Sequence, residues 1–293
     1  MELKLIADRS GRLSSFLRGE LKMSSGLMNR LKWQQLLFVN DTPVHTDYPV
    51  VPGDVIKVPL DEPVPDYPAE PGPLQILYED DHLLAVDKPA GMLIHPSRSR
   101  ITGTLANRVL AYYQKTGQNS AFHPLTRLDR DTFGVVLLAK NSHVHGLLGD
   151  LHLSGGFQKT YHALVFGGPA EDSGIIDAPI GRCPLPSLLR RIDPQGKPAV
   201  TEFTLLERHE ACSQLALRPI TGRTHQLRLH CAYKGYPILG DPQYRSEDSQ
   251  AFSRQLGLET QMLCAKELQF PHPITSQILT VTSRIDVNGF CRR

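Results

Sequence analysis

The spacing of hydrophobic residues changes within the first 60 residues of the chain. Apolar side chains recur at helical spacing over residues 13–21 and again over 27–31. After Trp33 the spacing changes to short apolar runs at 36–39 and 55–58, which are flanked by turn residues. This order predicts two helices followed by a small sheet, in an N-terminal unit of residues 1–60.

Residues 61–73 interrupt this hydrophobic pattern. The stretch DEPVPDYPAEPGP carries five prolines and four acidic residues and has few side chains to bury. Proline at this density favours extended polyproline geometry. We therefore expect a semi-rigid, solvated linker and a domain boundary, with the N-terminal unit moving separately from the rest.

The remaining segment, residues 74–293, alternates short apolar runs with helical patterns. Strands are expected at 83–86, 135–139, 160–166 and 213–217, with a loop feeding a further strand over 197–203. Helices are expected at 105–113 (capped by Thr102 or Thr104), at 142–151, and from Thr221 to Gly235. This segment is long enough to form a second, larger domain.

A cluster of charged residues stands directly before one of these strands. Arg127, Asp129, Arg130 and Asp131 precede Gly134 and the continuous apolar run that follows it. A run of that kind is typical of a fully buried strand, which can hold a reactive side chain in a fixed position. The cluster is equally compatible with a solvated turn that contains a local ion pair.

Composition narrows the class of protein. Of the 293 residues, 40% are hydrophobic and 21% are charged, which is ordinary for a globular chain. The five cysteines are scattered and form no C-x-x-C pair, which argues against a disulfide framework and a zinc site and favours a reducing compartment. Neither a membrane-spanning run nor a signal-peptide core is present, so we expect a soluble cytoplasmic protein.

The charge is unevenly distributed, although the formal net charge is only +2. Residues 9–33 contain six basic side chains and a single acid, Glu20. A local positive excess of this kind suits a polyanion such as RNA. It is also common on an ordinary solvated helix face.

Several catalytic chemistries can be excluded by their motifs. His225 and His230 are five residues apart, about 140° around a helix, so they cannot clamp one metal ion. No serine lies in a G-x-S-x-G elbow, and no glycine-rich phosphate loop occurs. What remains is one candidate aspartate, Asp129, beside arginines.

The N-terminal unit resembles the small RNA-binding fold named after a small-subunit ribosomal protein. That fold has a helix pair with basic residues, then a VNG sequence, then a PGD turn. Here VND replaces VNG at residues 39–41, and PGD stands at residues 52–54. The resemblance implies that residues 1–60 bind RNA.

The larger segment resembles the RluA/RluD-type pseudouridine synthases over about 170 residues. The motifs that carry the resemblance, in family order, are ILYEDDHLLAVDKPAGMLIHP, RLDRDTFGVVLLAKN, KTYHALVFG, GKPAVTEF and PITGRTHQLRLHCAYKGYPILGDPQY. The family commonly has HRLDxxTSG, whereas Thr126 here replaces the histidine and Phe133 the serine. Neither departure affects the aspartate.

The resemblance implies roles for individual residues. Asp129 matches the essential aspartate, Arg127 the arginine that evicts the target base, Tyr161 the aromatic residue that stacks on uracil, and Arg228 the arginine that pairs with the aspartate. We expect Arg223 and Thr132 to contribute to substrate binding. Considered without the resemblance, Arg228 and Tyr161 could be a surface arginine and a packing aromatic, and Arg223 could cap a loop.

The same resemblance implies a fold and a reaction. The expected fold class is α+β, a mixed and mainly antiparallel sheet with flanking helices and a central cleft. The reaction is the isomerisation of uridine to pseudouridine in structured RNA, which needs no cofactor and no metal. We expect a monomer acting on ribosomal RNA in preference to transfer RNA. A catalytically idle RNA-binding or ribosome-assembly protein and a glycosidase remain as alternatives.

Overall fold

The computed structural model describes residues 2–60, 65–97, 99–184, 186–187 and 189–287. Within these residues the N-terminal unit has its own hydrophobic core, built from side chains between Ala7 and Leu60. Its elements are β1 (Glu2–Ile6), β2 (Gly11–Arg12), α1 (Leu13–Gly19), α2 (Ser25–Trp33), β3 (Phe38–Val39), β4 (Thr42–Pro43), β5 (Pro49–Val50) and β6 (Val55–Pro59). The two predicted helices are therefore present, and the sheet has the order β1-β6-β3-β4.

The described part of the proline-rich segment differs from the expected solvated linker. Tyr67 packs against the core beneath α3 (Leu105–Lys115). The Asn107 amide donates to the Pro68 carbonyl (2.8 Å), and the Glu70 carboxylate accepts from the Gly103 backbone N–H (2.5 Å). Residues 67–70 are thus docked on the larger domain, because α3 offers them both an apolar surface and backbone partners. Residues 61–64 lie outside the described ranges.

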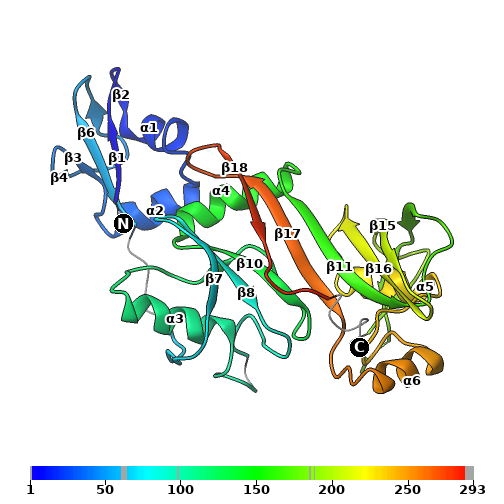
Figure 1. The fold of residues 1–293 in the computed structure, drawn as a ribbon. Coiled ribbons are helices and arrows are strands. Elements are labelled where there is room, and N and C mark those ends of the chain that lie inside the picture. The colour runs from blue at the N-terminus through cyan, green and yellow to red at the C-terminus, as the bar shows by residue number, and fades with distance from the viewer. Residues whose placement is uncertain (1, 61–64, 98, 185, 188, 288–293) are drawn as a thin grey trace.

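The N-terminal unit also touches the larger domain directly. Figure 1 shows α2 beside α4 (Ser142–Leu153), and the Arg30 guanidinium donates to the Ser142 hydroxyl at 2.9 Å. This hydrogen bond is a point of contact between the first turn of α4 and the N-terminal unit, which we expect to move separately.

The larger domain is built on a ten-stranded sheet with the order β12-β15-β16-β11-β17-β10-β8-β7, with β18 paired to β17 and β9 paired to β10. Its strands are β7 (Gln75–Glu79), β8 (Leu83–Lys88), β9 (His123–Pro124), β10 (Phe133–Ala139), β11 (Gln158–Phe166), β12 (Ser173–Asp177), β15 (Val200–Arg208), β16 (Cys212–Pro219), β17 (Leu263–Pro271) and β18 (Ile278–Thr282). A separate hairpin pairs β13 (Ile180–Arg182) with β14 (Arg190–Ile192). Among the pairs described for the large sheet, β10 with β17 is the parallel one and the others are antiparallel. The α+β class and the mainly antiparallel sheet are confirmed.

Helices cover both faces of the sheet near β10. Val136 and Leu138 face the core that includes α3, whereas Val135 and Leu137 face the core that includes α4. This alternation explains why residues 135–139 are apolar without interruption: each face of the strand is buried by a helix. β10 is therefore a fixed support for the segment before it, residues 127–131, which we call the charged loop.

The other half of the sheet is covered by α5 (Gln226–Tyr233) and α6 (Glu247–Gln255). Leu227 and Cys231 of α5 pack on β11 and β16. The helix predicted to start at Thr221 in fact starts at Gln226. The Gln226 side chain accepts from the Thr221 hydroxyl (2.8 Å) and the Arg223 backbone N–H (3.0 Å), which holds residues 221–225 in a turn.

No helix in the described ranges is both long and apolar enough to cross a bilayer.

Candidate active site

The charged loop reaches the sheet where β10 and β17 run parallel. Gly134, the second residue of β10, has φ +107°, and a side chain there would collide with the backbone of Ala265 on β17. Both the backbone conformation and the close approach require glycine. Gly134 thus lets the chain pass from the loop that carries Asp129 into β10 directly beside β17.

Two buried side chains hold this loop in shape. Lys88, fully buried at the end of β8, donates from Nζ to the carbonyls of Pro89 (3.0 Å), Met92 (2.8 Å) and Arg130 (2.8 Å). Burial lowers the pKa of Lys88 to about 8, although the charges of nearby aspartates oppose the shift. Lys88 therefore ties the loop to β8 through the Arg130 backbone.

Thr132 closes the same turn. Its backbone N–H donates to the Asp129 carbonyl (3.2 Å), and its hydroxyl accepts from the Gln261 amide (2.5 Å). The side chain is buried, so the substrate contact expected of Thr132 is not favoured by its position. Its place in the structure is to fix the turn on which Asp129 stands.

Asp129 and Arg228 come together from distant parts of the chain. Arg228, on α5, donates from Nη1 to the Asp129 Oδ2 at 3.1 Å. The Arg228 side chain is 5% exposed, whereas that of Asp129 is 34% exposed. The predicted pairing of these two residues is confirmed, and Asp129 retains a solvent-facing side.

A second carboxylate, Asp241, holds the other side of Arg228. Arg228 donates from Nε to Asp241 Oδ2 (2.7 Å) and from Nη2 to Asp241 Oδ1 (2.8 Å), and Gln243 accepts a further bond at 3.0 Å. The Asp241 side chain is completely buried. Burial alone would lower the pKa of Arg228, but the hydrogen bonds and charge of Asp241 raise it above its usual value. Arg228 is therefore a fixed cation between one buried and one accessible carboxylate.

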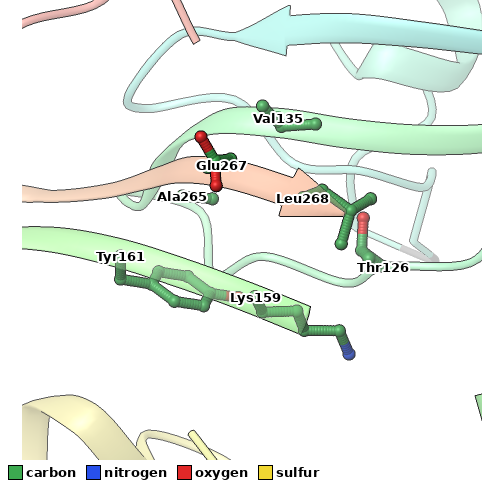
Figure 2. Close-up of a pocket in the computed structure, with 7 residues that line it drawn as sticks. All are labelled: Thr126, Val135, Lys159, Tyr161, Ala265, Glu267 and Leu268. Atoms are coloured by element: carbon green, nitrogen blue, oxygen red, sulfur yellow. The ribbon is translucent and has the colours of Figure 1, made fainter. Parts of the chain in front are cut away.

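Tyr161 lies on β11, across β17 from the Asp129 loop. It lines a small hollow at the junction of β10, β11 and β17, and Figure 2 shows it on the same strand as Lys159 and close to Ala265. The other residues around the hollow are Thr126, Val135, Glu267 and Leu268. Burial, followed by the charge of Asp129, raises the pKa of Tyr161 to about 12, so the phenol is neutral near pH 7.

The remaining predicted residues lie nearer the surface. Arg127 is exposed, and its side chain makes no hydrogen bond or ion pair with the residues that the structure describes. Arg223 is half-buried, and its Nε donates to the Pro198 carbonyl at 3.0 Å. Asp131 pairs with Arg130, both donor distances being 3.0 Å. Of the two aspartates in the loop, only Asp129 meets Arg228.

The two positions that depart from the family motif have structural roles. Thr126 is buried, and its hydroxyl accepts from the Leu137 backbone N–H at 3.3 Å. Phe133 packs in a core beneath α6. Both substitutions are thus accommodated on the supporting side of the loop.

Three residues of the site were not predicted as such. Lys88 and Asp241 belong to the DKPAG and GDPQY motifs, which carry the resemblance without revealing that their charged side chains are buried. His225, the residue before α5, places Nε2 3.8 Å from the Asp129 Oδ2. For Lys88 and Asp241, the sequence signal was a charged residue beside apolar residues of a motif. A charge that is buried in such a place requires a partner, which makes it a candidate for a role in the site.

Metal and disulfide chemistry find no support in the described residues. No group of three or more His, Cys, Asp or Glu side chains in the described part of the chain could hold a metal ion. Cys183, Cys231 and Cys264 are free thiols, and Cys291 lies outside the described ranges.

Comparison with known proteins assigns the fold and the reaction. The model of the RNA pseudouridylate synthase family matches residues 82–233, more than half of the chain. The chain belongs to this family. It is therefore an isomerase that converts uridine in RNA to pseudouridine, which removes the glycosidase and the idle binding protein as alternatives.

Relatives extend the match to almost the whole chain. The RNA pseudouridine synthase YjbO of Bacillus subtilis (strain 168) is 36% identical over 262 residues, covering 88% of this chain and 90% of the relative. Ribosomal large subunit pseudouridine synthase C of Vibrio cholerae is 31% identical, with 94% and 90% covered. The solved structure of human RNA Pseudouridylate Synthase Domain Containing 1 superposes with a TM-score of 0.61 at 27% identity, covering 74% of this chain and 86% of that one.

Proposed function

We propose that Asp129 carries the isomerisation and that the RNA substrate is ribosomal. The observation that supports the first part is the geometry of one carboxylate. Asp129 Oδ2 is held by Arg228, whereas no described residue donates a hydrogen bond to Oδ1. A carboxylate that is held through one oxygen and leaves the other open to a substrate is suited to act on a bound nucleoside.

The reaction sets what this carboxylate must do. The bond from uracil N1 to ribose C1′ breaks, the base turns, and a new bond forms from C5 to C1′ while the C5 hydrogen leaves as a proton. No electrons are gained or lost overall, so the isomerisation requires no redox cofactor. Asp129 serves either as the nucleophile at the ribose or as the base that starts glycal formation. In both routes Arg228 holds the orientation of the carboxylate through its bond to Oδ2.

The target base must leave its stack before Asp129 can reach the ribose. Flipping costs a few kcal/mol, and least where the base is already unpaired. The guanidinium of Arg127 is exposed and has no hydrogen-bond or ion-pair partner within the described part of the chain, and in this proposal it fills the vacated space and contacts phosphate. Tyr161 offers a ring face to the flipped base, a contact worth roughly 1 to 3 kcal/mol. Arg223, at the start of the turn before α5, is placed to meet a flanking phosphate.

The N-terminal unit supplies RNA affinity in this proposal. The side chains of Arg30 and Lys32 lie in the last turn of α2, and the Trp33 side chain, which ends that helix, is 86% exposed. Cations beside an exposed aromatic ring suit a phosphate backbone with a stacked base. The contact of Arg30 with Ser142 holds this surface against the catalytic domain.

Ribosomal RNA is favoured over transfer RNA for two reasons. Several relatives, including those of Vibrio cholerae and Nitrosomonas europaea, are named as ribosomal large subunit pseudouridine synthases. An added RNA-binding unit also suits a large structured substrate better than a small one.

Mapping of pseudouridines in a deletion strain tests this proposal. Ribosomal and transfer RNA would be compared between the deletion strain and strains complemented with the wild-type or the Asp129→Asn protein. We expect one or a few uridines of ribosomal RNA to be modified only with the wild-type protein. Loss confined to transfer RNA would support the alternative substrate. Restoration by Asp129→Asn would remove Asp129 from the mechanism.

A further inference from the structure

His225 adopts a backbone conformation that is uncommon for a residue with a side chain. It has φ +58° and ψ +19°, in the left-handed region, at the position just before α5. Conformations of this kind persist where the surroundings hold them, and they concentrate at functional sites. Here the conformation places the imidazole between Tyr244 and Asp129.

A short chain of hydrogen bonds fixes the tautomer of this imidazole. The Arg190 backbone N–H donates to the Tyr244 hydroxyl oxygen at 2.8 Å, and that hydroxyl lies 3.0 Å from His225 Nδ1. If Nδ1 carried the proton, the hydroxyl oxygen could accept it as a second bond, but the Tyr244 proton would then have no acceptor among the described residues. The arrangement in which the hydroxyl donates to Nδ1 satisfies both groups. We therefore assign the ring proton to Nε2.

That Nε2–H faces the carboxylate of Asp129. Nε2 lies 3.8 Å from Oδ2, the same oxygen that accepts from Arg228 at 3.1 Å. The separation exceeds a hydrogen bond in the free protein, and catalytic contacts of this kind shorten when substrate binds. With both donors on Oδ2, the oxygen left for the substrate is Oδ1.

We propose that His225 is a positioning residue for the isomerisation. As a neutral Nε2–H donor, oriented by Tyr244, it holds Asp129 in the rotamer that presents Oδ1 to the ribose. The proposal rests on the role of Asp129 as the reacting group. Tyr244 then acts indirectly, because its hydroxyl orients the imidazole of His225 and does not contact Asp129 or the substrate.

The neutral state of His225 follows from its surroundings. Burial lowers its pKa below the usual 6.5. The charged neighbours act in both directions: Asp129 and Asp241 raise the pKa, whereas Arg228 and Arg190 lower it. A neutral donor orients Asp129 without adding a second cation to a carboxylate that already meets Arg228.

Nitrogen NMR of the histidine side chains in the full chain tests the tautomer and the coupling directly. The resonances of His225 are identified by their loss in His225→Asn, a substitution that tolerates the left-handed backbone. In the wild type we expect the proton on Nε2. Tyr244→Phe should abolish the tautomer preference, and Tyr236→Phe, a matched change of a buried tyrosine outside this chain of bonds, should leave it intact.

The coupling to Asp129 has its own readout. Asp129→Asn should lower the pKa of His225, because it removes the nearest negative charge. A proton on Nδ1 in the wild type, or a His225 pKa that does not respond to Asp129→Asn, would overturn the proposal.

Single-turnover rates on RNA tritiated at uracil C5 complete the test. His225→Asn and Tyr244→Phe should slow the chemical step by about tenfold to a hundredfold with little change in RNA affinity, as expected for a misplaced reacting group. Unchanged rates in both variants would also overturn the proposal. An active Asp129→Asn enzyme would instead contradict the role of Asp129, while the tautomer and its coupling could still be measured.

Discussion

At the scale of single residues, the decisive contact is the one between Arg228 and its two carboxylates. Asp241 is fully buried, whereas Asp129 keeps a third of its side chain exposed. Arg228 therefore neutralises a charge that has no access to water and, through Nη1, orients one that does. We therefore expect stability and catalysis to depend on opposite sides of the same guanidinium.

Arg228→Ala is expected to lower the free energy of unfolding by about 3 to 5 kcal/mol, because it leaves Asp241 buried without its partner. The same substitution should abolish turnover, since Asp129 loses the donor at Oδ2. Urea unfolding at pH 7.5 measures the first effect.

The matched comparison is Asp129→Asn, which removes only the accessible carboxylate and should change the free energy of unfolding by less than about 1 kcal/mol. Equal losses of stability in the two variants would show that Asp129, and not Asp241, is the buried partner.

The sequence predicts the contact between two motif residues, but it does not predict roles that depend on burial or on backbone conformation. The pairing of Asp129 with Arg228 followed from the motifs, although 99 residues separate them. The roles of Lys88, Asp241 and His225 did not, because they depend on which charged side chains the fold buries and on a left-handed backbone at one position. For Thr132, which we expect to contribute to substrate binding, the sequence does not reveal that the hydroxyl accepts from the buried Gln261.

At the scale of elements, the short apolar runs predicted the strands well, because burial on both faces demands continuous apolar sequence. β10 and β8 are examples. The start of α5 was misplaced because the Gln226 side chain stabilises a turn over residues 221–225 that competes with helix. The docking of residues 67–70 was missed because a proline-rich composition does not reveal that α3 provides partners for Tyr67 and Glu70.

The contacts of residues 67–70 with the larger domain should affect the stability of truncated chains. A chain beginning at Pro65 should keep the contacts of Tyr67, Pro68 and Glu70 with α3 and its N-terminal turn and should be as stable as the catalytic domain of the full protein. A chain beginning at Gly72 loses them and should be less stable by roughly 1 to 3 kcal/mol. Thermal unfolding of the two fragments distinguishes them. Equal stabilities would mean that the docked segment contributes nothing.

The N-terminal unit should contribute affinity and leave the chemical step intact. Without it, the chain beginning at Pro65 should bind long structured RNA more weakly, and its affinity should depend less steeply on salt, because fewer phosphates are neutralised. Binding measured between about 50 and 200 mM salt tests this. In the full chain, Trp33→Ala should weaken binding with little change in the salt slope. An unchanged slope in the truncated chain would mean that the basic residues are only a solvated face.

At the scale of the whole molecule, histidines with a lowered pKa should contribute to the response to acid. Burial lowers the pKa of eight of them: His82, His95, His143, His145, His152, His162, His225 and His230. A folded-state pKa below the unfolded value means that the unfolded chain binds more protons as the pH falls through about 6.5. Folding stability is therefore complete above that pH and decreases below it.

We expect the urea midpoint to be lower at about pH 5.5 than at about pH 7.5, with a similar dependence on denaturant at both. The acidic groups whose pKa is lowered, Glu79, Asp80 and Asp193, add to the loss only at still lower pH. A midpoint that stays constant or rises on acidification in this range would show that these histidines become protonated within the folded protein.

We propose that one carboxylate, Asp129, performs the isomerisation from a loop fixed by Lys88, Thr132 and Arg228. Tritium release from RNA labelled at uracil C5 tests it most directly, because only isomerisation liberates the C5 hydrogen. With purified protein, Asp129→Asn should show no release although its folding and RNA binding match the wild type, whereas Asp131→Asn should remain active. Release by Asp129→Asn within tenfold of the wild type, less than about 1.4 kcal/mol of transition-state stabilisation, would contradict the account.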